Sequence, residues 1–174
     1  MPEGNQILHR RSIRLKEYDY GQPGAYFVTL CTKFRKPIFG EIIDGTMKMN
    51  ETGLIIEATW QWLSEQYSYV KLDTWMVMPN HFHGIVFLLD DRRGGSRTAP
   101  TKRKPLGRLI GAFKTVSTKK INQIRGTPGQ PVWQRNYYEH VIRNEIDLGE
   151  TREYIQNNPL KWLEDENHPA NIKK

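Results

Sequence analysis

The sequence predicts an α+β fold of the ferredoxin-like βαββαβ type, with an antiparallel sheet, an added hairpin and one more helix near the C-terminus. Two observations lead to this prediction. Short runs rich in β-branched and aromatic residues alternate with longer segments in which apolar residues recur at helical spacing. Two of the strand-like runs are joined by a turn too tight for a crossover, so these strands pair antiparallel. RNA-recognition modules share this architecture, so the fold class leaves the function open.

The first half of the domain begins with a strand over residues 25–32. A hairpin follows over residues 38–49, where Asp44-Gly45 separates two apolar runs. Asn50 then caps a helix that runs to Gln66. The tryptophans of this helix are expected to pack rather than to stack on bases. The positions expected to face the core are Leu54, Ile55, Ala58, Trp62 and Leu63.

The second half adds a strand over residues 69–78, which leads through Pro79-Asn80 into another strand that starts at His81. A basic helix is predicted over residues 106–125 and a short strand over 138–142. The apolar positions of the helix expected to face inward are Leu106, Leu109, Ile110, Phe113, Val116 and Ile124.

The last helix starts after Asn144, a good N-cap, and runs to Asn157, because Pro159 disfavours helical geometry at the residue before it. Tyr154 and Asn158 are four residues apart, so they share one face of this helix. The buried stripe is expected on a neighbouring face, at Leu148, Thr151 and Ile155.

The composition describes one compact basic domain. The chain has 174 residues, enough for one hydrophobic core and too few for two. A net charge of +7 and a pI of about 9.5 favour a polyanionic partner, and without a long apolar span we expect nucleic acid and no membrane. Cys31 is the only cysteine, which excludes an internal disulfide and a cysteine-based zinc site and fits a reducing cytoplasm.

We divide the chain into a basic arm over residues 1–20, a single domain over 21–163 and a polar tail over 164–174. Residues 91–105 are predicted to be a flexible basic linker within the domain, because glycines interrupt the pattern among many cations. Such a linker can contact DNA or can simply be solvated. The residues expected to contact nucleic acid are Arg92, Arg93, Lys102, Arg103, Lys104, Lys119, Lys120 and Arg135.

Two histidines, His81 and His83, flank Phe82 at the start of a predicted strand. Side chains alternate along a strand, so both imidazoles project from one face, about 7 Å apart. They are either half of a metal site or two polar residues on a solvent-facing surface. With the Asn158 amide oxygen they would make an open shell of nitrogen and oxygen ligands, which suits Mg²⁺ or Mn²⁺ better than a structural zinc. Tyr154, one helical turn before Asn158, would be well placed as a nucleophile.

Three segments resemble the HUH single-tyrosine transposases, which belong to the IS200-like transposases. Met78-Pro79-Asn80-His81-Phe82-His83 is similar to their His-hydrophobic-His motif. The segments Trp133–Asn144 and Glu153–Pro159 resemble the block before the tyrosine helix and the helix itself in the REP-associated branch. The insertion-sequence branch often has glutamine where this chain has Asn158, so the match is to the REP-associated tyrosine transposases.

This resemblance implies that the last helix is catalytic and that the chain cleaves and rejoins single-stranded DNA. Tyr154 would be the nucleophile, leaving a 5′-phosphotyrosine and a free 3′-OH, and His81, His83 and Asn158 would bind the metal. The branch is associated with short palindromic repeats in bacterial chromosomes, so a hairpin DNA partner and a location at the nucleoid are expected.

Two other readings of the sequence stay open. The domain can bind single strands without chemistry by stacking on aromatic side chains, or it can be a metal phosphodiesterase that uses water, with Tyr154 only packed. No G-x-x-x-x-G-K-[ST] loop is present, so no nucleotide cofactor is expected. A homodimer is compatible with the sequence.

Overall fold

The structure, a computed structural model, describes residues 18–90 and 103–171. Most of the predicted arm and most of the predicted linker lie outside these residues, and so do Arg92, Arg93 and Lys102.

The fold is a four-stranded antiparallel sheet with helices on both faces. Its strands are ordered β4–β5–β1–β6 (β1, Gly24–Cys31; β4, Val70–Val77; β5, His81–Leu88; β6, Tyr138–Ile142). Neighbouring strands pair antiparallel. With the hairpin of β2 (Gly40–Ile43) and β3 (Thr46–Met49) set aside, the element order is βαββαβ, which confirms the predicted ferredoxin-like fold.

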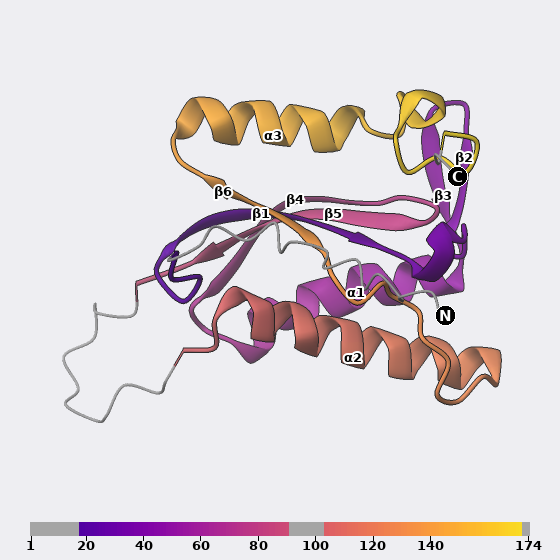
Figure 1. Cartoon of the computed structure of the whole chain (residues 1–174), viewed down its shortest axis with the longest axis horizontal. Coiled ribbons are helices and arrows are strands. Elements are labelled where there is room, and N and C mark those ends of the chain that lie inside the picture. The colour runs from indigo at the N-terminus through magenta and orange to yellow at the C-terminus, as the bar shows by residue number, and fades with distance from the viewer. Residues whose placement is uncertain (1–17, 91–102, 172–174) are drawn as a thin grey trace, which may run out of the picture.

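The three helices divide between the two faces of the sheet. Helices α1 (Glu51–Gln66) and α2 (Leu106–Arg125) cover one face, and α3 (Glu145–Asn157) lies alone on the other (Figure 1). Two short 3-10 turns, η1 (Lys33–Arg35) and η2 (Trp162–Glu164), follow β1 and α3 respectively. The predicted caps are confirmed: Asn50 accepts from the Gly53 amide at 3.1 Å, and Asn144 accepts from the Asp147 amide at 2.9 Å.

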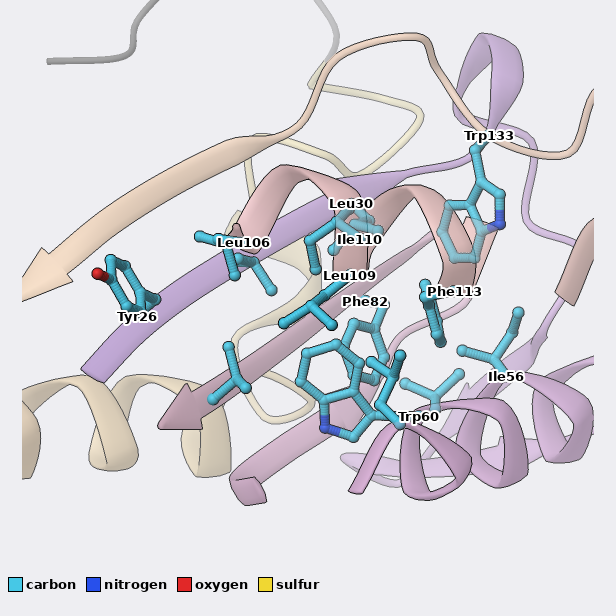
Figure 2. Packing of buried hydrophobic residues seen from close by; sticks show 14 of the residues in the cluster. Tyr26, Leu30, Ile56, Trp60, Phe82, Leu106, Leu109, Ile110, Phe113 and Trp133 are labelled. Carbon is cyan, nitrogen blue, oxygen red and sulfur yellow. The ribbon is translucent and has the colours of Figure 1, made fainter. Parts of the chain in front are cut away.

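The larger core lies between the sheet and helices α1 and α2 (Figure 2). Trp60 is fully buried there, with its ring centroid 4.7 Å from that of Phe82 and 5.5 Å from that of Phe113. The tryptophan therefore packs, as predicted.

The predicted inward positions are confirmed at Leu63 of α1 and at Leu106, Leu109, Ile110 and Phe113 of α2, and differ elsewhere. Leu54 is 54% exposed, and Ala58 is exposed as well, because α1 packs through a face about one residue away. This helix is apolar around a broad arc, so periodicity alone did not define its buried face. In α2, Ile121 fills the core position and Ile124, in the last turn, is exposed. The buried residues of α1 are Thr52, Gly53, Ile56, Thr59, Trp60 and Leu63.

A smaller core and an ion pair hold α3 on the opposite face. The predicted stripe is confirmed at Leu148 and Ile155, which pack against Phe27 of β1 and Ile85 of β5. The register of β4 shifts between Leu72 and Trp75, which is where one extra residue enters the strand. Such a bulge re-aims a side chain, and here Asp73 accepts two hydrogen bonds from Arg152 of α3, at 2.8 and 2.7 Å. The bulge and the ion pair thus fix α3 next to β4.

Candidate functional site

Strand alternation places both histidines under α3. His81 pairs with Cys31 and His83 pairs with Thr29, while Phe82 between them enters the larger core. Both imidazoles are buried, so the alternative of two polar residues on a solvent-facing strand is wrong. Buried polar side chains need partners, and the contacts of these rings show what they are arranged for.

Each imidazole has one nitrogen bound to the protein and the other directed into a shared site. His81 Nδ1 lies 2.9 Å from Asn80 Oδ1, and His83 Nδ1 lies 2.8 Å from Thr29 Oγ1. The two Nε2 atoms face each other at 2.9 Å. Metal-binding histidines are held in this way by their outer nitrogens; in this structure the two inner nitrogens are hydrogen-bonded to each other, where a metal would replace the shared proton.

Asp165 brings a carboxylate to the same point. Its Oδ2 lies 3.8 Å from His81 Nε2, and the ligand atoms of His81, His83 and Asp165 all lie within 4.8 Å of one another. Sequence reasoning missed this residue, because it follows α3 in a segment without periodicity that was expected to be a polar tail. In the structure Asp165 and Asn167 are buried, and the backbone N–H of Asn167 donates to Asp165 Oδ1 at 2.6 Å. The run of three acidic residues Glu164-Asp165-Glu166, soon after Trp162, was the signal in the sequence that could have pointed to it.

Asn158 is buried at the end of α3 and reaches the same group. Its Nδ2 donates to Asp165 Oδ2 at 3.1 Å. Its Oδ1 is buried and has no hydrogen-bond partner among the described residues. A buried amide oxygen without a donor is costly unless a ligand satisfies it, and a hard cation is such a ligand. Two imidazoles, one carboxylate and one amide oxygen therefore fit a divalent metal such as Mn²⁺ or Mg²⁺.

Burial keeps both imidazoles neutral, as metal ligands must be. It lowers the pKa of His81 to about 4, against the opposing effects of Asp165 and the Asn158 side chain. It lowers the pKa of His83 well below its usual range, and the neighbouring His81 adds to this effect. Near pH 7 both rings therefore offer a nitrogen lone pair.

Tyr154 lies beside this group on the exposed side of α3. Its ring centroid is 5.3 Å from that of His83 and 6.0 Å from that of Phe27. The residue is 48% exposed, as expected from its place off the buried stripe. Partial burial and the negative charges of Asp165 and Glu166 raise the pKa of the phenol to about 12, so the hydroxyl is protonated at neutral pH.

A cleft of about 530 Å³ opens beside the histidine–tyrosine contact. Tyr154 and His83 line it together with Arg35 and Gln134. Tyr138 also lines the cleft, from the same face of the sheet as His83, with its ring centroid 6.1 Å from that of Phe27. Tyr154 is therefore accessible from solvent in a cleft that also carries the Arg35 cation.

Comparison with known proteins places the chain in a family and identifies its fold. An uncharacterized protein of Haemophilus influenzae (strain Rd) is 37% identical over 173 residues, covering 92% of this chain and 93% of that protein. The chain belongs to the family of that Haemophilus protein. No protein-family model matches it.

The structure of this chain is similar to that of a REP-associated tyrosine transposase solved bound to a REP hairpin. The TM-score is 0.60 at 19% identity, and the match covers 87% of this chain and 74% of that one. The family member therefore has the fold of the REP-associated tyrosine transposases, as the sequence motifs predicted.

Some of the residues predicted to contact nucleic acid lie within the described part of the chain, and two of them, Lys119 and Arg135, line the same groove. This groove of about 870 Å³ lies between α2 and the loop before β6, and Lys114 lines it as well. Arg103 instead pairs with Asp90 at 3.1 Å, and Lys104 donates to the Tyr67 hydroxyl at 3.1 Å. Lys120 is exposed on α2. Among the described residues, none of the helices is both long and apolar enough to cross a membrane.

Proposed function

We propose that the chain is a metal-dependent DNA strand-transferase that cleaves and rejoins single-stranded DNA through Tyr154. The observation that carries this proposal is the convergence of the half-exposed Tyr154 on a buried group of His81, His83, Asp165 and Asn158 at an open cleft. These residues come from a strand, a helix and the segment after that helix, so tertiary structure brings them together. A purely structural role would not require a buried amide oxygen that finds no hydrogen-bond partner in the described part of the chain, beside two inward-facing imidazole nitrogens.

In the proposed reaction the Tyr154 oxygen attacks a backbone phosphorus. The bond from phosphorus to the tyrosine oxygen forms and the bond from phosphorus to the 3′-oxygen breaks, giving a 5′-phosphotyrosine and a free 3′-OH. The phenol loses one proton and the 3′-oxygen gains one. Because one phosphate ester replaces another, the energy of the broken bond is stored, and the 3′-OH of the same or another strand can reverse the step without a nucleotide cofactor.

His81, His83, Asp165 and Asn158 would hold the divalent metal, Mg²⁺ or Mn²⁺. When bound, the metal would draw charge from the scissile phosphate and stabilise the leaving 3′-oxygen. The protein supplies the geometry: β5 fixes both imidazoles, and α3 carries the nucleophile and Asn158 four residues apart. Asp165 adds a negative charge, so this set of ligands would bind a divalent cation more tightly than a set of neutral ligands alone.

The proposed substrate is single-stranded DNA beside a hairpin. The similar REP-associated tyrosine transposase was solved bound to a REP hairpin, and this chain carries a net charge of +7. The proposed setting is the bacterial nucleoid, where short palindromic repeats would be processed by a monomer or a homodimer. We expect little cleavage of uninterrupted duplex, because the nucleophile must reach an accessible backbone.

The decisive test is capture of the covalent intermediate. A hairpin oligonucleotide with a single-stranded flank, labelled at its 3′ end, should give a protein band that keeps the label after denaturation in the presence of Mn²⁺. Tyr154→Phe, His81→Ala, His83→Ala and EDTA should each abolish this band. Tyr138→Phe is the matched control, since it removes a hydroxyl from the same cleft and should leave the band.

The three readings of the chain give different results in this assay. Binding without cleavage would show a binding module, and cleavage without an adduct would show a phosphodiesterase that uses water. An adduct that survives Tyr154→Phe and disappears in Tyr138→Phe would move the catalytic centre to β6.

A further inference from the structure

Asn80, in the tight turn between β4 and β5, is fully buried and joins three parts of the chain. Its Nδ2 donates to the backbone carbonyl of Arg35 at 2.9 Å and to that of Asn167 at 2.7 Å. Its own backbone carbonyl accepts from the amide of Thr32 at 2.9 Å. Neither the predicted site nor the proposed reaction gives this residue a role.

These contacts fix which way the Asn80 amide points. Reversing the amide would place its oxygen against the carbonyl oxygens of Arg35 and Asn167, which can only accept. The oxygen therefore faces His81 Nδ1, 2.9 Å away. Because that oxygen can only accept, His81 must carry its proton on Nδ1, and its Nε2 keeps the lone pair. His83 differs: the Thr29 hydroxyl beside its Nδ1 can donate or accept, and the 2.9 Å contact with the bare His81 Nε2 places the His83 proton on Nε2.

We propose that Asn80 is a positioning residue that fixes His81 as its Nδ1–H tautomer and so directs the Nε2 lone pair at the metal. The proposal rests on the proposed function in one respect, that a metal binds at His81. The Asn80 side chain also donates to the backbone carbonyl of Asn167. The backbone N–H of Asn167 in turn donates to Asp165 Oδ1. One buried amide thus sets the tautomer of one ligand and the position of the loop that carries another.

The tautomer can be measured on the full-length wild-type protein without metal or DNA. Long-range ¹H–¹⁵N correlation spectra distinguish a protonated from an unprotonated ring nitrogen. We expect His81 to be protonated at Nδ1 and bare at Nε2. A proton on His81 Nε2 with a bare Nδ1 would overturn the proposal, and this result depends neither on DNA cleavage nor on the folding of any variant.

Metal affinity separates positioning from packing. Mn²⁺ binding to the protein alone, followed by electron paramagnetic resonance, should weaken about tenfold or more in Asn80→Ala, since partners of metal ligands typically contribute on the order of 10–100-fold. Thr32→Val is the matched control, because it removes a buried hydroxyl that donates to the Asn80 backbone carbonyl at 3.0 Å and leaves the amide side chain in place. We expect Thr32→Val to bind within about twofold of wild type.

An equal loss in both variants would reduce Asn80 to a packing residue and overturn the proposal, as would an unchanged affinity in Asn80→Ala. If wild type bound Mn²⁺ no better than His81→Ala, the metal site itself would be refuted. That outcome overturns the proposed function, whereas the tautomer of His81 is decided by the spectra.

Discussion

Gly84, next to His83 in β5, should not tolerate even one added methyl group. A Cβ there would lie 2.7 Å from Trp60 Cζ2 and 2.8 Å from Phe82 Cε1, and both rings are fully buried. Neither ring has free space, because Trp60 packs on Phe82 and also on Phe113. Overpacking of a well-filled core lowers the free energy of unfolding by about 1–3 kcal/mol. Two contacts this short place the overpacking cost of Gly84→Ala at about 3 kcal/mol.

Backbone entropy offsets part of this cost. Replacing glycine by alanine stabilises a compatible site by about 0.4–1 kcal/mol, so the net loss in the free energy of unfolding should be about 2 kcal/mol. For a chain of this length that lowers Tm by about 4–8 °C. Equilibrium unfolding in urea is the assay, and the midpoint should fall while the m-value is unchanged.

Two further variants make the Gly84 prediction specific. Gly149→Ala, on α3 with no atom within 4 Å of its added Cβ, should stabilise by about 0.5–1 kcal/mol. In a Trp60→Phe background the cost of Gly84→Ala should shrink, because the smaller ring removes the closest contact. A Gly84→Ala protein as stable as wild type, or an undiminished cost in that background, would refute the reasoning.

Two further predictions concern the site and its support. Asp165→Asn keeps the shape of the side chain and removes its charge, so Mn²⁺ affinity and adduct formation should fall at least about tenfold. The control is Glu166→Gln, which removes an exposed carboxylate next to Asp165; this variant should bind Mn²⁺ like wild type. The Arg152 guanidinium holds the pKa of Asp73 down at about 2, below its usual 3.8, so this pair stabilises the fold above about pH 4 and the contribution is lost as the pH falls through about 2. In Arg152→Met the acid limb of the stability curve between pH 4 and 2 should therefore flatten, and an unchanged acid limb would show that the pair does not hold α3 in place.

Local chemistry determined much of this protein from its sequence. Alternation along a strand put His81 and His83 on one face, because neighbouring side chains of an extended chain must point opposite ways. Asn144 set the start of α3, since a cap acts within a few residues. The helix ends at Asn157 as predicted, but Asn158 keeps helical backbone angles (φ −60°, ψ −41°), so the steric effect expected of Pro159 is not what ends it. The four-residue spacing of Tyr154 and Asn158 then put both on one side of that helix.

Tertiary structure decided what periodicity does not contain. Asp165 enters the site from an irregular segment, and Asn80 is held by carbonyls of Arg35 and Asn167, far from it along the chain. Such contacts leave no repeat in the sequence, because they depend on how separate segments meet. The buried face of α1 was misjudged for the same reason: its apolar arc is broad, and only packing against the sheet and α2 selects the line through Ile56 and Trp60. The sequence thus determined which residues share a strand or a helix, and packing between segments determined which of them form the site.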